Sequence, residues 1–103
     1  MSHISCIYVT HPNSAQATSL CDTLLSERLI ACSVLLPAES SYWWNGNIER
    51  SQEVVSILKT LPDKWESVKA RISELHSYDV PCILKFDVEA NEAYAAWVQS
   101  EVT

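Results

Sequence analysis

The sequence predicts an α+β fold with the element order β-α-β-β-α-β and a further helix at the C-terminus. Two observations support this prediction. Short runs rich in β-branched and aromatic residues alternate with longer segments whose apolar residues recur every three or four positions, as in amphipathic helices. The only glycine in 103 residues, Gly46, follows Asn45, and Asn-Gly is the preferred pair for a two-residue type I′ hairpin turn.

The chain begins with a strand and a helix. Residues 4–10 form a β-rich run, which His11-Pro12 breaks. Asn13 is placed to cap a helix expected over residues 14–28. The apolar stripe of this helix is formed by Ala17, Leu20, Cys21, Leu24 and Leu25.

A long hairpin follows. Residues 29–36 are apolar and short enough for a buried strand, and Pro37 predicts a bend or bulge over residues 37–39. The strand then continues over residues 40–44 to the Asn-Gly turn, and residues 48–60 return. Such long arms reach beyond a small core, so the hairpin predicts an oligomer.

The second half repeats the helix–strand pattern. Pro62 stands in the first turn of a helix expected over residues 63–76, where its missing N–H has no cost. Residues 82–88 form the last strand, and Asn91 is expected to cap a short helix. The resulting order is the split βαβ, or ferredoxin-like, arrangement, and we expect one domain over residues 1–103.

Composition excludes several classes of protein. The net charge of −6 argues against binding to a nucleic-acid backbone and gives no support for binding to anionic membranes. No apolar run approaches the roughly 18 residues of a membrane span, and the N-terminal residues do not resemble a leader. The four cysteines form no C-x-x-C motif, which argues against zinc-ribbon and thioredoxin-type sites, and free thiols are the default in a cytosolic chain. These features predict a cytoplasmic protein.

A few polar residues at the ends of apolar strands are candidates for chemistry. Lys59 follows an apolar run, so it needs a partner carboxylate, a ligand anion or a route to water. Cys32 is either an inert core thiol or, with His76, part of a site for a soft metal. His76 equally suits the C-terminal end of a helix dipole, whereas His3 and His11 are too isolated to interpret.

Seven blocks of sequence resemble the CutA family of divalent-ion tolerance proteins, in the right order and at the right spacings over residues 4–98. They are Thr10-His11-Pro12, Glu27-Arg28-Leu29-Ile30-Ala31-Cys32, Ser41-Tyr42-Trp43-Trp44-Asn45-Gly46, Glu53, Leu58-Lys59-Thr60, His76-Ser77-Tyr78-Asp79-Val80-Pro81 and Tyr94-Ala95-Ala96-Trp97. The chain departs from the usual pattern at Val34, where the family has asparagine, and at Cys82, where it has glutamate. Val9 stands where some members have a cysteine.

The resemblance implies a homotrimer similar in layout to PII signalling proteins. It also implies a role in the tolerance of divalent metals, through metal binding rather than catalysis. The implied ligand is copper or another divalent metal, without an organic cofactor. The expected metal ligands are Cys32, His76, Cys82 and Glu53. The residues expected in a cleft between subunits are Tyr42, Trp44, Lys59 and Tyr78, and those expected at the trimer interface are Trp43, Gly46 and Trp97.

Two alternatives remain open. The first is a PII-like signalling or scaffold trimer that binds a small anionic ligand or a partner protein in the cleft around Lys59. The second is an enzyme in which Lys59, Glu53 and Tyr78 serve acid/base roles.

Overall fold

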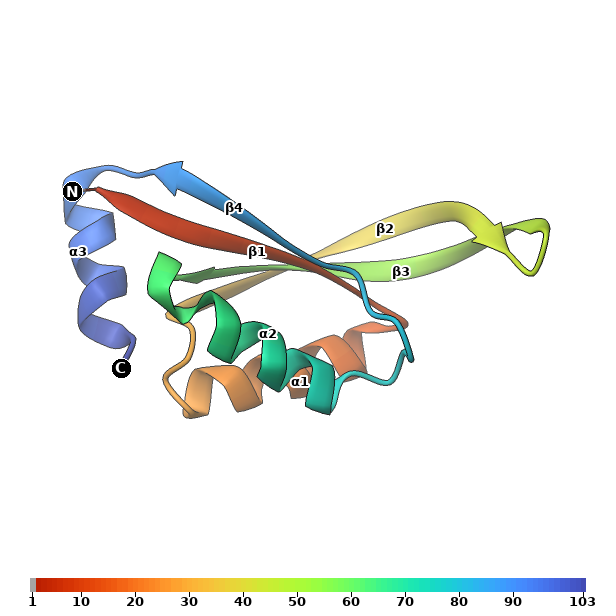
Figure 1. The fold of residues 1–103 in the computed structure, drawn as a ribbon, viewed down its shortest axis with the longest axis horizontal. Helices are drawn as coiled ribbons and strands as arrows, with labels where there is room; N and C mark the ends of the chain where they lie inside the picture. Colours follow the sequence, from red (N-terminus) through yellow and green to blue (C-terminus); the bar gives the residue numbers. More distant parts are fainter. Residues whose placement is uncertain (1) are drawn as a thin grey trace.

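A computed structural model describes residues 2–103 and has four strands in one antiparallel sheet (Figure 1). The strands are β1 (His3–His11), β2 (Cys32–Trp44), β3 (Asn47–Thr60) and β4 (Ile83–Glu89). The helices are α1 (Ser14–Ser26), α2 (Trp65–Leu75) and α3 (Glu92–Glu101), and a 3-10 turn at Pro62–Lys64 precedes α2. The strand order β2-β3-β1-β4 and the element order confirm the predicted ferredoxin-like fold.

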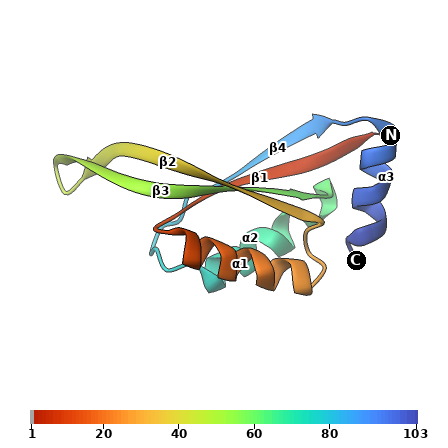
Figure 2. The same ribbon diagram turned by 180° about the vertical axis from the view of Figure 1, so that it is seen from behind.

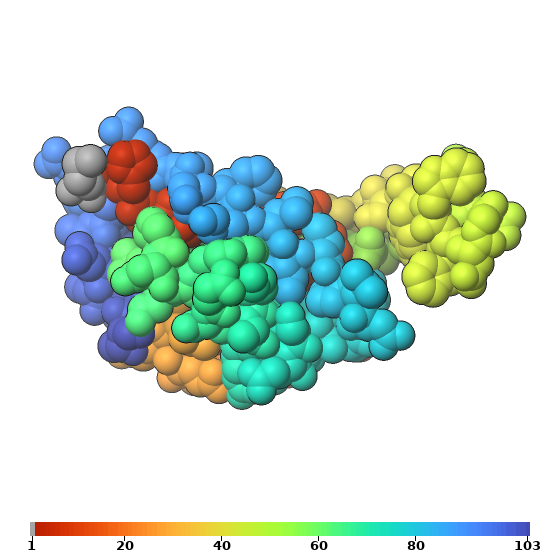
Figure 3. All heavy atoms as spheres, in the orientation of Figure 1, coloured from red at the N-terminus to blue at the C-terminus, as the bar shows by residue number. Residues whose placement is uncertain are grey.

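The β2–β3 hairpin projects well beyond the rest of the molecule and forms a separate lobe in the space-filling view (Figure 3). Asn45 and Gly46 have φ angles of 50° and 80°, as the predicted type I′ turn requires. A Cβ added to Gly46 would meet nothing within 4 Å, so glycine is favoured there by the backbone conformation and not by lack of space.

The predicted interruption of the hairpin at residues 37–39 is wrong. β2 pairs with β3 without a break from Cys32 to Trp44, and Pro37 lies opposite Val54. The reason is that β2 lies at the edge of the sheet, where a residue whose N–H faces outward can be proline without losing a ladder hydrogen bond.

The predicted end of the first helix differs from the structure, and of the two predicted helix caps only one is present. α1 ends at Ser26, because Arg28 adopts a left-handed φ of 61° and closes the helix with its N–H on the Leu25 carbonyl. Residues 29–31 therefore precede the strand. The expected Asn13 cap is present, with its Oδ1 accepting from the Gln16 N–H at 2.8 Å. Asn91, in contrast, makes no side-chain capping hydrogen bond.

α1 and α2 cover one face of the sheet, and the main core lies between them and the strands (Figures 1 and 2). Its buried residues are Ile7, Val9, Leu20, Cys21, Leu24, Ile30, Leu58, Val68 and Ile72. A second cluster joins Ile4 of β1 to Ala95, Val98 and Val102, and it holds α3 at the end of the sheet where β1 begins.

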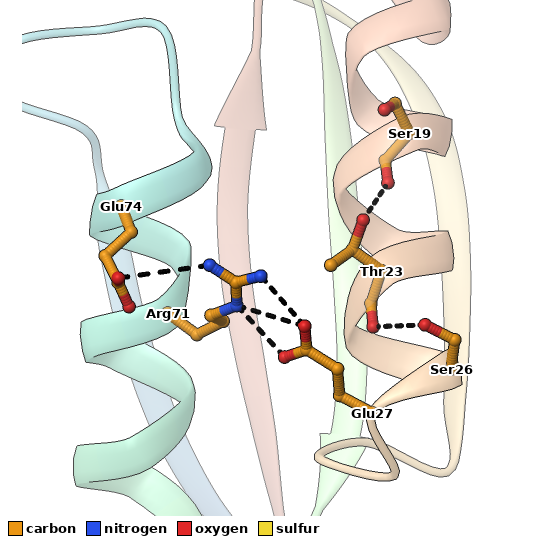
Figure 4. Close-up of polar contacts among 6 residues, drawn as sticks. All are labelled: Ser19, Thr23, Ser26, Glu27, Arg71 and Glu74. Atoms are coloured by element: carbon orange, nitrogen blue, oxygen red, sulfur yellow. Dashed lines mark hydrogen bonds and ion pairs between the residues drawn. The ribbon is translucent and has the colours of Figure 1, made fainter.

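An ion pair braces the two core helices (Figure 4). The Arg71 guanidinium donates three hydrogen bonds to the carboxylate of Glu27: Nη2 lies 2.8 Å from Oε2, and Nε lies 3.0 Å from Oε1 and 3.2 Å from Oε2. The pKa of Glu27 is lowered, mainly by its hydrogen bonds from Arg71. Arg71 also reaches Glu74 of its own helix at 3.9 Å, so it joins α2 to the end of α1.

The face of the sheet opposite to α1 and α2 carries exposed apolar side chains, and we call it the open face. Side chains alternate along a strand, so Val34 and Leu36 flank Leu35, and Leu84 follows Ile83; Leu35 and Ile83 pack against the core on the other face. The exposed large apolar residues of the open face are Val34, Leu36, Leu84, Phe86 and Val88. No helix within residues 2–103 is long and apolar enough to cross a membrane.

Candidate ligand sites at the two ends of the sheet

The first candidate site lies where β1 ends, and we call it the histidine end: His11, His76, Tyr78 and Glu53. His11 is the last residue of β1 and has an inward position, so it is 1% exposed. Its Nε2 lies 2.7 Å from the Ser56 hydroxyl. The ring stacks on that of His76, with centroids 5.3 Å apart and planes 16° from parallel.

His76 follows α2, and both nitrogens of its ring are hydrogen-bonded. Nε2 lies 2.7 Å from the carbonyl oxygen of Thr10, which can only accept, so Nε2 carries the proton. Nδ1 then accepts from the backbone N–H of Tyr78 at 3.1 Å. A metal ion can coordinate this imidazole only if one of the two bonds opens.

Tyr78 connects the histidines to the hairpin. Its hydroxyl donates to Glu53 Oε2 at 2.7 Å, and its ring lies 4.8 Å from that of His76. Burial, followed by the bond to Glu53, raises the pKa of Tyr78. Burial, followed by the proximity of His76, lowers the pKa of His11 to about 4. Both His11 and Tyr78 are therefore neutral at pH 7.

Two hollows flank the histidine end. One, of about 220 Å³, lies between α1 and the end of α2, and its lining includes both imidazoles together with Gln16, Ser19 and Thr23. The other, of about 550 Å³, lies at the base of the hairpin. Its polar lining residues are Asn13, Glu39, Gln52 and Glu53. A ligand can thus approach the cluster from the helix side or from the hairpin side.

The second candidate site lies near α3, and we call it the lysine end: Lys59, Cys6, Cys32 and Tyr94. Lys59 of β3 pairs with Cys6 of β1 on one side and with Cys32 of β2 on the other. All three have the alternation of the open face. The Lys59 Nζ lies 5.3 Å from the centroid of the Tyr94 ring, which α3 places over it.

The titratable groups of the lysine end influence one another. Burial lowers the pKa of Lys59, but the hydrogen bond to Tyr94 and the nearby thiols outweigh it, so the net shift is upward. Burial raises the pKa of Cys6. Burial, then a hydrogen bond to Cys32, raises the pKa of Tyr94. At neutral pH the site therefore combines an ammonium group with a neutral phenol and a neutral Cys6 thiol.

Comparison with known proteins identifies the family. The family model described as CutA1 divalent ion tolerance protein matches residues 5–101. The chain belongs to the CutA1 family. The divalent-cation tolerance protein CutA of Pyrococcus horikoshii is 49% identical over 96 residues, which are 92% of this chain and 94% of that one. The CutA of Thermococcus kodakarensis is 40% identical over 93 residues, or 89% of each chain.

Solved CutA structures have the same fold. The crystal structure of CutA1 from Pyrococcus horikoshii superimposes with a TM-score of 0.94 at 46% identity, covering 96% of this chain and 98% of that one. The structure of a protein described as the periplasmic divalent cation tolerance protein CutA from Archaeoglobus fulgidus gives a TM-score of 0.94 at 32% identity. That match covers 97% of this chain and 99% of the other.

Within the single chain, the four predicted metal ligands do not lie together. His76 and Glu53 belong to the histidine end, and Cys82 directly precedes Ile83, which pairs with Val9 of β1. Cys32 lies at the lysine end, where its register partner Lys59 stands six residues from Glu53 along β3, roughly 20 Å. Within residues 2–103, no three His, Cys, Asp or Glu side chains are arranged to hold a metal ion. The ligand set stays a prediction that needs a second subunit.

The predicted cleft and interface residues are also spread over the subunit. Tyr78 lies at the histidine end and Lys59 at the lysine end. Tyr42 and Trp44 are exposed on the hairpin, where the Tyr42 hydroxyl lies 3.3 Å from that of Ser51. Trp43 and Gly46 are at the hairpin tip, and Trp97 packs on Tyr94 of α3 with ring centroids 5.6 Å apart. Their roles in assembly stay predictions.

Sequence reasoning missed His11 as a functional candidate. Its signal was nevertheless present, because positions 5, 7, 9 and 11 alternate inward along β1 and place His11 on the buried face. Tyr94 was identified only as part of a family block. Its contact with Lys59 joins α3 to β3, which no short-range pattern encodes.

Proposed function

We propose that this member of the CutA1 family is a homotrimer that binds copper or a similar divalent metal, in the cytoplasm and without catalytic turnover. The observation that carries the proposal is the chain of contacts from His76 through Tyr78 to Glu53. Glu53 belongs to a hairpin that extends away from the rest of its chain (Figure 1). A neighbouring subunit is then the natural source of the missing ligand.

The open face and the hairpin tip support an assembly. Leu36, Leu84 and Phe86 are 47%, 47% and 52% exposed on the open face. At the hairpin tip, Trp43 and Trp44 are 73% and 61% exposed. Apolar side chains of this size gain roughly 25 cal/mol for each Å² that a partner covers. Three subunits in a PII-like layout are the arrangement that family resemblance suggests.

The predicted ligands His76, Glu53, Cys82 and Cys32 suit a borderline or soft metal. Imidazole nitrogen and thiol sulfur are ligands for copper and zinc, and a carboxylate adds charge. Coordination through His76 Nδ1 displaces the Tyr78 N–H, so metal binding has a built-in cost and should be weak. In this proposal Cys32 comes from a neighbouring subunit, and no organic cofactor takes part.

Calorimetric titration of the purified oligomer tests the metal site. Cu²⁺ is the main probe, and Zn²⁺ is a second one that cannot oxidise thiols. Glu53→Gln keeps an acceptor for Tyr78 but removes the carboxylate charge, so we expect at least a tenfold loss of affinity. His76→Gln and Cys32→Ser should each weaken binding too. Glu49→Gln, an exposed position nearer the hairpin tip, is the matched control. Unchanged affinity in the first three variants would remove these residues as ligands.

Light scattering tests the assembly independently. We expect the mass of three copies of the 11.6 kDa chain. Phe86→Asp places a charge on the open face and should reduce the particle to smaller species. The matched control is Ser100→Asp, which places the same charge at an exposed position of α3 and should leave the mass unchanged. A monomer or dimer in the unmodified protein would contradict the trimer.

A second candidate function is a PII-like signalling or scaffold trimer that binds a small anionic ligand or a partner protein in the cleft. Lys59 favours it, because no carboxylate within residues 2–103 lies within 4.0 Å of its ammonium group. The cytoplasmic location rests on the four free cysteines, which suit a reducing compartment. Cell fractionation tests that location, and recovery outside the cytoplasm would contradict it.

A further inference from the structure

Lys59 is a partly buried cation to which the described residues supply no carboxylate. Four other cationic side chains, at positions 28, 69, 71 and 85, have carboxylate partners. Lys59 is instead enclosed by the side chains of two cysteines in adjacent strands and by the Tyr94 ring. In a chain with a net charge of −6, a cation in such surroundings is best explained by an anion that binds to it.

The groups around Lys59 are donors. The ammonium offers three N–H groups, the Tyr94 phenol offers one O–H, and thiols are weak S–H donors. The Lys59 Nζ lies 5.3 Å from the centroid of the Tyr94 ring, so the ammonium and the phenol are neighbours. No carboxylate among residues 2–103 pairs with this ammonium, so none competes with a bound anion. Such a set can bind two oxygens of one anionic group, with the ammonium on one and the phenol on the other.

We propose that Lys59 and Tyr94, with Cys32 beside them, form a binding site for a small oxyanion, either a carboxylate or a phosphate group. The proposal rests on the second candidate function and names the residues and the chemical class of its ligand.

The test measures binding of two defined probes to the whole oligomer. Inorganic phosphate and succinate are titrated against sodium chloride of equal ionic strength, with affinity followed by calorimetry and by thermal shift. Lys59→Met keeps most of the apolar stem and removes the charge, and Lys59→Arg restores a charge. Tyr94→Phe keeps the ring and removes only the hydroxyl. Lys64→Met, in the 3-10 turn, is the matched control.

We expect saturable binding of at least one probe, and the tighter probe identifies phosphate or carboxylate as the preferred group. Lys59→Met should weaken binding of that probe about tenfold or more, because a hydrogen bond to a charged group contributes at least that factor to affinity. Tyr94→Phe should weaken it about threefold to tenfold. Lys59→Arg should retain binding, and Lys64→Met should match the unmodified protein. If Lys59→Met does not fold, Lys59→Gln provides the same measurement.

Two results would overturn the site, and they differ in what else they affect. If a probe binds equally to the unmodified protein and to Lys59→Met, anions bind elsewhere, so the second candidate function survives without this site. A probe at about 50 mM saturates a site even when its Kd is in the millimolar range. If neither probe binds at concentrations up to that value, both the proposed site and the second candidate function fail. Loss of the trimer in Lys59→Met without any anion binding would assign Lys59 to a carboxylate of a neighbouring subunit instead.

Discussion

The two ends of the sheet hold their titratable side chains in different ways. At the histidine end the imidazole of His11 is buried, stacked and hydrogen-bonded, so it is part of the folded structure. At the lysine end Lys59 is only partly buried, beside two cysteines of adjacent strands and one aromatic ring. The difference indicates that substitutions at the histidine end should cost stability, whereas those at the lysine end should cost ligand affinity.

The largest expected effect is on folding. His11→Ala leaves a cavity, ends the stacking with His76 and removes the hydrogen-bond partner of buried Ser56. We expect a loss of about 2–4 kcal/mol in the free energy of unfolding. Lys59→Met should lose less than about 1 kcal/mol. Urea unfolding at fixed protein concentration measures both, and equal losses would contradict the contrast between the ends.

Acid should also distinguish the two ends. The folded pKa of His11, about 4, lies below the value of 6.5 for an unperturbed histidine, so between these values the unfolded chain binds a proton that the folded chain does not. The stability contributed by neutral His11 is therefore complete above pH 6.5 and is lost as the pH falls towards 4. This shift in the pKa of His11 corresponds to about 3 kcal/mol in the free energy of unfolding. We expect a loss of about 2 kcal/mol, because the adjoining hollow admits solvent.

The control for this pH dependence is His11→Gln, which can still bond Ser56 but does not titrate. Urea unfolding from pH 4 to pH 8 should show a shallower slope in this variant than in the unmodified protein. Lys59→Met should leave the slope unchanged, because the raised pKa of Lys59 lies far above this range. The same slope in His11→Gln and the unmodified protein would assign the acid sensitivity to other groups.

The smallest effect compares two tyrosines. Tyr78→Phe removes the hydrogen bond to Glu53, so it should reduce the free energy of unfolding by about 1 kcal/mol. Tyr94→Phe keeps the ring over Lys59 and should change it by less than about 0.5 kcal/mol. Thermal unfolding of both variants in the same buffer provides the comparison. A larger loss for Tyr94→Phe would mean that the lysine end is also structural.

Much of the fold could be predicted because its signals are local. Hydrophobic periodicity located each strand and helix, and Asn45-Gly46 located the hairpin turn. Pro37 was misread because its effect depends on whether its strand is central or at an edge, which is a property of the sheet. The end of α1 was missed because Arg28 adopts a left-handed conformation usually left to glycine.

The candidate sites were less predictable, because they depend on contacts between distant segments. Cys32 closes an apolar run and His76 stands at the end of a predicted helix, so the sequence alone did not exclude that the two side chains lie close together. Strand register places them at different ends. The polar surroundings of His11 likewise come from β3 and from the residue after α2.

The central claim is that the histidine end takes a metal cation and the lysine end takes an oxyanion. One crossed titration tests it most directly, with Cu²⁺ and phosphate each added to the unmodified protein, to Glu53→Gln and to Lys59→Met. The account predicts that Glu53→Gln weakens only metal binding and that Lys59→Met weakens only phosphate binding, each by about tenfold. Loss of both ligands in one variant, or of neither in both variants, would contradict it.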